Sequence, residues 1–428
     1  MEIQQQFLKV LVVGINPWID NTGINTLINF FENWDKQALA HIYTRSNLPN
    51  TRVCDTFFRI SEPAVIRSVY KRKTKTGARV ENTRSANDNK APNFYQGKKS
   101  WWKQLLREIA WKFGKWKSAE LRAFLQEYAP DVLFFPVYAN VYMCRLQNYI
   151  AKITGKPIVL YISDDNYSYQ SVAKSPCSLL HRFWLRKQEK KLFKAAKRVL
   201  VISPKQKEEY DALFKIECDI LTKGVDFSSV TYTEKPIHTP IKMVYTGKLI
   251  IGRWKSLAAI ADAFAKLNAN RRAIELDIYT TDELTEKQKK ALNKNGCSVK
   301  GALSLEEVQK VQQDADILVF AESLERKYKN VARLSFSTKI TDYLKNGKCI
   351  FAIGDKGIAP IDYFMKYDSA VVATSYNEIE EKLQMIIDNP LVIGQYGAKA
   401  YECGKKHHKK EKMDKVLMDV ITSAWKGE

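Results

Sequence analysis

A run of two hydroxyls and one lysine, Ser337, Thr338 and Lys339, stands where a helix is predicted to begin. Apolar runs that are typical of buried strands lie on both sides of this helix, and Gly347 is a typical helix stop. Free backbone N–H groups, the positive end of the helix dipole, hydroxyls and a lysine together suit a phosphate. Alternatively, the hydroxyls only cap the helix and Lys339 points into solvent.

A second group of candidate residues follows the strand-like run 242–245. Gly247 allows the backbone to turn close to a ligand, and Lys248, Arg253 and Lys255 supply positive charge. These cations are equally compatible with an ordinary surface of a basic protein.

Three further positions are candidates because each follows a predicted strand. Glu322 ends the run 316–321 and is a candidate for contacts to a sugar or a base. Asp164 follows the run 157–163, where a carboxylate could orient a hydroxyl or act as a base, or could simply cap the next helix. Gly23 lies at a strand–helix turn and suggests a close approach of a ligand, although ordinary turns use glycine too.

The elements that must position these residues form a repeated pattern. The 428 residues are too many for one ordinary core and suit two domains. Strand-like runs alternate with helical ones at residues 10–15, 132–135, 157–163 and 198–203, and again at 242–245, 275–280, 297–300, 316–321, 349–353 and 370–373. This α/β pattern predicts two Rossmann-like, doubly wound domains that face a cleft, with ligands at the carboxyl ends of the strands.

The composition is that of a folded protein, with 45% hydrophobic and 11% aromatic residues. No apolar run is long enough to span a membrane, and the N-terminus leads straight into a strand-like run without a signal peptide. The seven cysteines are scattered, which indicates reduced thiols and a cytoplasmic protein. We expect no metal, because the five histidines have no spaced acidic partners.

The net charge of +22 is concentrated in residues 71–117, which hold 14 Lys and Arg and three acids. Residues 71–99 are predicted to be a mobile loop. Residues 101–117 are predicted to form a helix with an apolar face that includes Ile109, Phe113 and Trp116, opposite a basic face of Lys103, Arg107, Lys112 and Lys115. This helix either lies on an anionic membrane or packs its apolar face on the first domain. A nucleic-acid surface is a further alternative, although no recognition motif supports it.

The segment Phe336-Ser-Thr-Lys-Ile-Thr-Asp-Tyr-Leu-Lys-Asn-Gly-Lys-Cys-Ile-Phe-Ala-Ile-Gly354 resembles the nucleotide-sugar segment of GT-B glycosyltransferases of the group 1, or family 4, kind found in bacterial surface polysaccharide biosynthesis. In that family a Ser-Lys pair opens the helix and an acid, here Asp342, faces the donor ribose. The family's two glutamates, seven residues apart, correspond here to Leu334 and Asp342, so this chain departs from the pattern.

Residues 194–205 and the run Leu221-Thr-Lys-Gly-Val-Asp226 also resemble this family, in which Gly-Val-Asp closes the first domain. The resemblance implies an N-terminal acceptor domain with the basic insertion 71–117 and a C-terminal donor domain. It also implies a final helix that returns to the first domain. The expected boundaries are 1–226, 227–240 for the linker, 241–400 and 401–428.

The implied reaction moves a hexosyl group from a nucleotide sugar, UDP- or GDP-linked, to the hydroxyl of a lipid-linked or glycan acceptor. The resemblance further implies retention of configuration, no metal and no separate cofactor. We expect the protein to be peripheral on the inner face of the cell membrane and not to bind nucleic acid. The pyrophosphate would be held by Ser337, Thr338, Lys339, Lys248 and either Arg253 or Lys255. The rival interpretations are a non-catalytic GT-B scaffold subunit, a nucleic-acid-binding protein, and a sugar-nucleotide epimerase, for which no acid–base pair is apparent.

Overall fold

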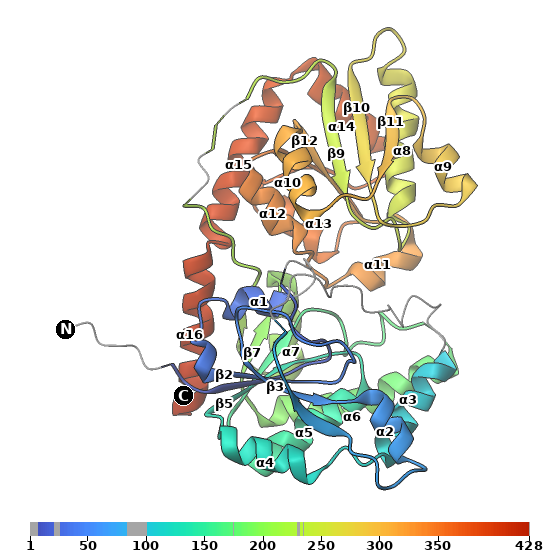
Figure 1. Ribbon diagram of the computed structural model, residues 1–428. Helices are drawn as coiled ribbons and strands as arrows, with labels where there is room; N and C mark the ends of the chain where they lie inside the picture. The colour runs from blue at the N-terminus through green and yellow to red at the C-terminus, as the bar shows by residue number, and fades with distance from the viewer. Residues whose placement is uncertain are drawn as a thin grey trace, which may run out of the picture. The chain divides into compact units, whose positions relative to one another are not determined.

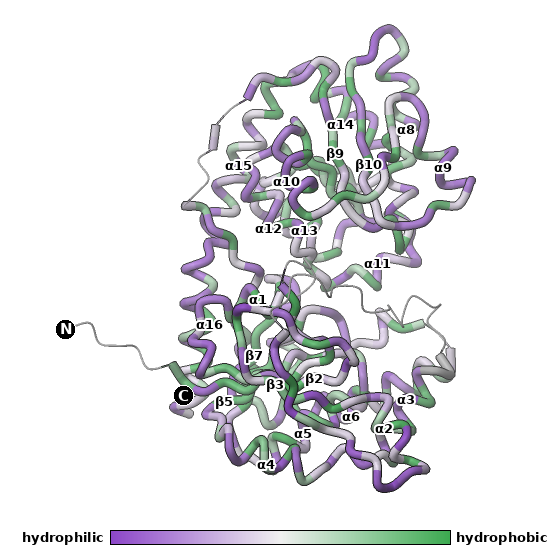
Figure 2. The backbone as a smooth tube through the Cα atoms, in the orientation of Figure 1, coloured by the Kyte–Doolittle hydropathy of each residue, from purple (hydrophilic) through white to green (hydrophobic). Residues whose placement is uncertain are grey.

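The computed structural model describes residues 7–20, 26–83, 101–173, 175–228, 232–233 and 235–427, except the side chains of residues 101–103. The chain divides into two compact units (Figure 1). The first contains Met1–Ile202, Lys207–Leu221 and Asp414–Glu428, and the second contains Ser203–Gln206 and Thr222–Met413. In both units the strands carry the hydrophobic residues, and the helices around them are amphipathic (Figure 2).

Among the described residues, the first unit is built on one eight-stranded sheet of order β4-β3-β2-β1-β5-β6-β7-β8. All pairs are parallel except the antiparallel pair of β3 and β4. The strands are β1 (Val10–Val13), β2 (Leu39–Tyr43), β3 (Thr56–Ile60), β4 (Gly77–Val80), β5 (Val132–Pro136), β6 (Ile158–Ile162), β7 (Ala196–Val201) and β8 (Cys218–Ile220).

The helices around the first sheet each bury at least one apolar side chain. They are α1 (Thr26–Phe31), the short η1 (Lys36–Ala38), α2 (Glu62–Ser68), α3 (Trp101–Phe113), α4 (Ala119–Tyr128), α5 (Val141–Thr154), α6 (Pro176–Ala195) and α7 (Pro204–Phe214). The final helix, α16 (Lys410–Lys426), returns to this unit, as predicted. Asn33 donates to Asp414 (2.8 Å) and Arg198 donates to Ser423 (2.7 Å).

The second unit has a six-stranded parallel sheet, counted over the described residues, of order β11-β10-β9-β12-β13-β14. Its strands are β9 (Ile241–Thr246), β10 (Ile274–Tyr279), β11 (Cys297–Gly301), β12 (Ile317–Ala321), β13 (Cys349–Ile353) and β14 (Val371–Ala373). Its helices are α8 (Arg253–Leu267), α9 (Glu286–Leu292), α10 (Leu305–Asp314), α11 (Arg326–Ala332), α12 (Lys339–Asn346), α13 (Ala359–Lys366), α14 (Tyr376–Asp388) and α15 (Leu391–His407). The strand order reverses between β9 and β12, which makes this pair the topological switch point.

Two predictions for the basic segment are wrong in part. Residues 77–80 are not a mobile loop but form β4, whose Gly77 packs against the Phe58 ring. Residues 71–76 and 81–83 of the predicted loop form turn and coil, and residues 84–99 lie outside the described residues. Helix α3 forms as predicted, but Trp116 lies beyond its end.

Helix α3 does not pack the predicted apolar face on the first domain, so that alternative is wrong for Ile109 and Phe113. Ile109 and Phe113 are exposed (43% and 56%), whereas Glu108 and Trp111 are buried. Polar groups can lie on the buried face because they have partners there. Arg107 donates to Glu62 (3.1 Å), and Glu108 accepts the backbone N–H of Val141 (2.9 Å).

All seven cysteines are free thiols, and all except Cys177 are buried. This agrees with the predicted reduced state. Over the described residues, we find no helix that combines the length and apolarity needed to span a membrane.

Candidate functional site

The candidate site lies at the switch point of the second unit, where the loops after β9 and β12 meet the start of α12. Gly247 follows β9 with φ of 148°, and its N–H donates to the carbonyl of Tyr279 (2.9 Å). A Cβ atom built on Gly247 would lie 1.7 Å from Nζ of Lys339. The loop after β9 can therefore accept the Lys339 ammonium only if residue 247 is glycine.

Lys339 is the first residue of α12, and its side chain reaches back to the end of β9. The ammonium lies 5.3 Å from the centroid of the Tyr245 ring, within the range of a cation–π contact. At the helix start, the Ser337 hydroxyl accepts the N–H of Lys339 (3.4 Å). Thr338 is the N-cap residue but, within the described chain, forms no side-chain cap hydrogen bond. Of the two predicted caps, only Ser337 has a contact of this kind.

Burial, followed by the positive charge of Arg253, lowers the pKa of Lys339 to about 8. The carboxylates of Glu322 and Asp282 act in the opposite direction but do not cancel these effects. Lys339 forms no ion pair among the described residues. Its charge is thus held in a partly desolvated position beside another cation, an arrangement that favours an arriving anion.

Arg253, the first residue of α8, forms a two-pronged ion pair with Glu322. Its Nε lies 3.0 Å from one carboxylate oxygen, and Nη2 lies 2.7 Å from the other. Glu322 is buried at the end of β12, and its carbonyl accepts the Ser256 hydroxyl (2.7 Å). Because the pair is bidentate and its carboxylate is buried, the guanidinium is held in one orientation.

The other two predicted cations lie outside this pair. Lys255 pairs with Glu325 (2.7 Å) and is more exposed than Arg253. The Lys248 side chain is exposed. Its backbone carbonyl accepts a hydrogen bond from the Tyr245 hydroxyl (2.7 Å), which stabilises the loop. The sequence left Arg253 and Lys255 as alternatives, and of the two it is the charge of Arg253 that lowers the pKa of Lys339.

Asp342 lies one turn into α12, where its carboxylate contacts Lys223 (2.5 Å). Lys223 belongs to the predicted Gly-Val-Asp segment, so this segment meets the candidate site within the second unit. Leu334, at the position of the family's first glutamate, is fully buried in the core. It offers no polar contact to a carbohydrate.

Asp164 belongs to the first unit and is not part of this cluster. Asp164 is exposed after β6 in the first unit, where the Ser163 hydroxyl donates to it (3.3 Å). Its neighbour Asp165 is buried and accepts the N–H of Ser168 (2.9 Å), which stabilises the local turn. Gly23 lies outside the described residues.

Three residues of the site were missed from the sequence: Tyr245, Ser256 and Asp282. Asp282 follows β10 and accepts the N–H of Leu249 (2.6 Å), which stabilises the loop that carries Lys248. It follows a parallel strand closely, and this signal could have identified it. Tyr245 and Ser256 carried no such signal, because an aromatic residue in a strand and a serine in a helix are ordinary core positions.

The second unit, numbered along its own strands, has the order of a Rossmann nucleotide-binding domain, with cations at the switch point. Two such units, with a last helix that returns from the second to the first, define the GT-B fold. Of the comparisons with known proteins, the one with solved structures agrees with this assignment. No protein-family model and no curated protein sequence matches the chain.

Solved structures of the same fold match nearly the whole chain. Anabaena HepE in complex with UDP is 9% identical and covers 97% of this chain and 100% of its own, with a TM-score of 0.62. TarM is 12% identical over 97% of this chain and 99% of its own (TM-score 0.61). Sucrose-phosphate synthase from Thermosynechococcus elongatus is 9% identical over 98% and 100% (TM-score 0.60). At these identities the likeness establishes the fold.

Proposed function

We propose that this protein is a glycosyltransferase that moves a hexosyl group from a nucleoside-diphosphate sugar to an acceptor hydroxyl. The observation that carries the proposal is the cluster of Gly247, Arg253, Glu322 and Lys339 at the switch point of the second unit. HepE, which shares the fold, is described in complexes with UDP and with UDP-glucose, which supports a uridine nucleotide as the first donor to test.

In the proposed reaction, the diphosphate lies against Lys339 and the N-terminal turn of α12. Departure of the nucleoside diphosphate leaves more negative charge on the phosphate than the intact donor carries. Lys339 and the oriented guanidinium of Arg253 stabilise this charge, which lowers the barrier to departure. Asp342 is proposed to contact the ribose, with Lys223 holding its carboxylate in place. The same proposal includes retention of configuration, independence from metals and a role for Asp164 toward the acceptor.

The test is turnover and binding with UDP-glucose, UDP-N-acetylglucosamine and GDP-mannose. We expect one donor to raise the melting temperature and to be hydrolysed or transferred. Lys339→Ala should abolish both effects, whereas Lys345→Ala, on the same helix but outside the cluster, should retain them. If no nucleotide sugar binds, or if Lys339→Ala binds donors normally, the proposal is wrong. Donor binding without hydrolysis or transfer to any acceptor would instead support a non-catalytic scaffold, the reading that the buried Leu334 favours.

We also propose that the first unit docks on an anionic membrane, where a lipid-linked acceptor would be found. Helix α3 exposes a stripe formed by Leu106, Ile109 and Phe113. It contacts α2 through Arg107 and α6 through the pair of Gln104 and His181, and both neighbouring helices also expose apolar side chains. Described cations of the segment 71–117, such as Lys73, Lys112 and Lys115, lie on α3 and on the loops that follow α2 and α3, so apolar contact and charge attraction would act together.

A further inference from the structure

The first unit contains a cavity of about 630 Å³ that is separate from the cluster in the second unit. It lies between the segment 72–76, the segment 111–120 and the facing helices α5 and α6. Its volume is that of a small-molecule site, for which about 300–1,000 Å³ is usual. The described residues that line it include seven Lys and Arg and one carboxylate, Glu120. The cavity is therefore a concave and strongly cationic site.

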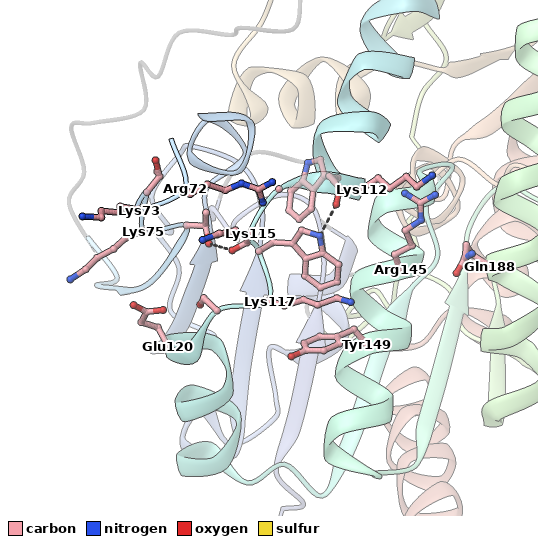
Figure 3. A pocket seen from close by; sticks show the side chains of 16 residues that line it. Arg72, Lys73, Lys75, Lys112, Lys115, Lys117, Glu120, Arg145, Tyr149 and Gln188 are labelled. Atoms are coloured by element: carbon pink, nitrogen blue, oxygen red, sulfur yellow. Dashed lines mark hydrogen bonds between the residues drawn. The ribbon is translucent and has the colours of Figure 1, made fainter. Parts of the chain in front are cut away.

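Its wall is aromatic and holds one of the cations in place. Trp111 and Trp116 are buried there, and the indole N–H of Trp116 donates to the carbonyl of Trp111 (2.6 Å). The Lys117 ammonium lies 5.2 Å from the centroid of the Trp116 ring and 5.1 Å from that of Tyr149. Figure 3 shows Lys117 extending over Tyr149, while Lys73 and Lys75 extend outward at the rim.

Two hydrogen-bond donors of the wall are buried without an acceptor. Within the described part of the chain, neither Nε1 of Trp111 nor Nη1 of Arg145 has a hydrogen-bond partner. Buried donors are nearly always paired in proteins, so each unpaired one calls for a specific explanation. Both belong to residues that line the same cavity, which makes a shared acceptor the simplest explanation.

The cations of the cavity are also not neutralised by the fold. Arg72, Lys112, Lys117 and Arg145 form no ion pair with any described residue. Low-dielectric walls around such a group focus a positive potential and raise the local concentration of anions. The donors of this cavity are a guanidinium, ammonium groups and an indole N–H. A phosphate or pyrophosphate satisfies them better than a single carboxylate would, because it offers more oxygens to several donors at once.

We infer that this cavity binds the phosphate or pyrophosphate group of a second ligand, independently of the nucleotide sugar. Arg72, Lys112, Lys117 and Arg145 contact its oxygens, and Trp111 donates its indole N–H. The same chemistry is presented by the headgroup of an anionic lipid and by a soluble phosphorylated saccharide. A site of this kind would select a phosphorylated acceptor or anchor the first unit at a phosphate-bearing surface.

The test uses calorimetric titration of the full-length protein with sodium pyrophosphate at constant ionic strength. Because the second unit is also proposed to bind a diphosphate, we expect two binding events. Lys339→Ala should remove one event. Replacement of Arg72, Lys112 and Lys117 by Gln should weaken the other at least about tenfold, the effect of losing one charge-assisted hydrogen bond. If Lys339→Ala removes its event and leaves the cavity event in place, the two proposals can be judged separately.

Matched controls separate the cavity from the general charge of the protein. Lys152, Lys156 and Lys197 are exposed residues of the first unit outside the cavity, and their joint replacement by Gln removes the same charge. This control should bind pyrophosphate like the wild type. Trp111→Phe keeps an aromatic ring but removes the N–H, and Arg145→Lys keeps the charge but removes the fork, so each should weaken the cavity event. Equal pyrophosphate binding by the cavity variant and the control variant would overturn the inference.

Vesicles identify the source of the phosphate group. If it belongs to a lipid, phosphatidylcholine vesicles that contain phosphatidic acid should co-sediment with the wild type, and free pyrophosphate should displace them. If pyrophosphate binding depends on the cavity but vesicle binding does not, the ligand is a soluble phosphate ester. A single-stranded oligonucleotide that binds more tightly than pyrophosphate and is lost in the same variants would refute the assignment.

Discussion

The ammonium of Lys339 occupies the space that a side chain on Gly247 would need, because a Cβ on Gly247 would lie 1.7 Å from Nζ of Lys339. The two residues are far apart in sequence and come from the end of β9 and the start of α12. A glycine and a lysine that looked like separate candidates therefore form one feature of the site. The backbone after β9 is open so that the lysine can enter.

The first prediction follows from this contact. Gly247→Ala should displace the Lys339 ammonium and also strain the backbone, since φ at Gly247 is 148°. We expect donor binding to weaken by about tenfold or more, the consequence of losing one charge-assisted hydrogen bond. Titration with the best donor measures the effect, and Gly301→Ala, a positive-φ glycine whose Cβ would meet nothing within 4 Å, is the control for strain alone. Equal weakening in both variants would mean that strain, and not Lys339, is responsible.

The second prediction concerns pH and the affinity for donor. Burial and the neighbouring Arg253 lower the pKa of Lys339 to about 8, so the ammonium loses its proton as the pH rises through this value. The affinity for a diphosphate should then fall above about pH 8, and this step should be missing in Lys339→Gln. Titrations of donor affinity against pH measure it. A pH-independent affinity in the wild type would contradict the proposed contact.

The same pKa predicts an effect on stability. The folded pKa of Lys339 lies below the ordinary value of 10.5, so between about pH 8 and about pH 10.5 the unfolded chain binds more protons than the folded chain. The stability contributed by this residue therefore rises with pH in that window, and the full penalty is present below it. Lys339→Gln should raise the melting temperature at pH 7 while it weakens donor binding. A lower melting temperature at pH 7 would show that Lys339 stabilises the fold.

The third prediction separates Arg253 from Lys255. Arg253→Ala should destabilise the protein by about 3–5 kcal/mol, because it leaves the carboxylate of Glu322 buried and unpaired. Lys255→Ala should change stability little, since its pair with Glu325 is partly exposed and Glu325 also pairs with Lys327. Denaturation by urea measures both. Replacement of the pair by Arg253→Met with Glu322→Leu should restore stability but not turnover, and recovery of turnover would exclude Arg253 from the reaction.

The fourth prediction separates the two sides of α3. Trp111→Ala should cost about 3–5 kcal/mol of stability, because Trp111 is buried against Trp116 and Tyr142. Leu106→Ser with Phe113→Ser should leave stability nearly unchanged and reduce co-sedimentation with anionic vesicles, since both side chains are exposed. Ile153→Ser, an exposed position on α5, is the control. Unchanged vesicle binding by the double variant would exclude the α3 stripe as a docking surface.

The fold could be predicted to different degrees in the two halves. All six strands of the second unit were predicted, because strands buried on both faces of a parallel sheet appear as apolar runs. In the first unit β2 and β3 were missed, since His41 and Arg59 interrupt them, and β8 was missed because it is only three residues long. The missed β4 lies inside a basic segment that looked like a loop. A strand that contains polar residues gives no continuous apolar run, so it is not recognised from the sequence.

The sequence singled out several residues that the structure brings together at the switch point, but it could not give their pairings. Lys339, Gly247 and Arg253 were identified because charge and glycine next to strand ends are local signals. The choice of Arg253 over Lys255 depended on which carboxylate each one meets, Glu322 or Glu325. For the same reason the sequence could not decide which side of α3 is buried: Glu108 lies on the buried side because its carboxylate accepts the backbone N–H of Val141.

The amino-acid sequence by itself determined the two-unit α/β architecture and the loops that carry the candidate chemistry. It could do so because apolar periodicity and glycine placement act over a few neighbouring residues. Only the tertiary structure decided that Lys339 enters the space beside Gly247 and that Arg72, Lys112, Lys117 and Arg145 share one cavity. Burial, pKa and ion pairing depend on atoms that are distant in the chain, and these become neighbours only when the sheets and helices pack.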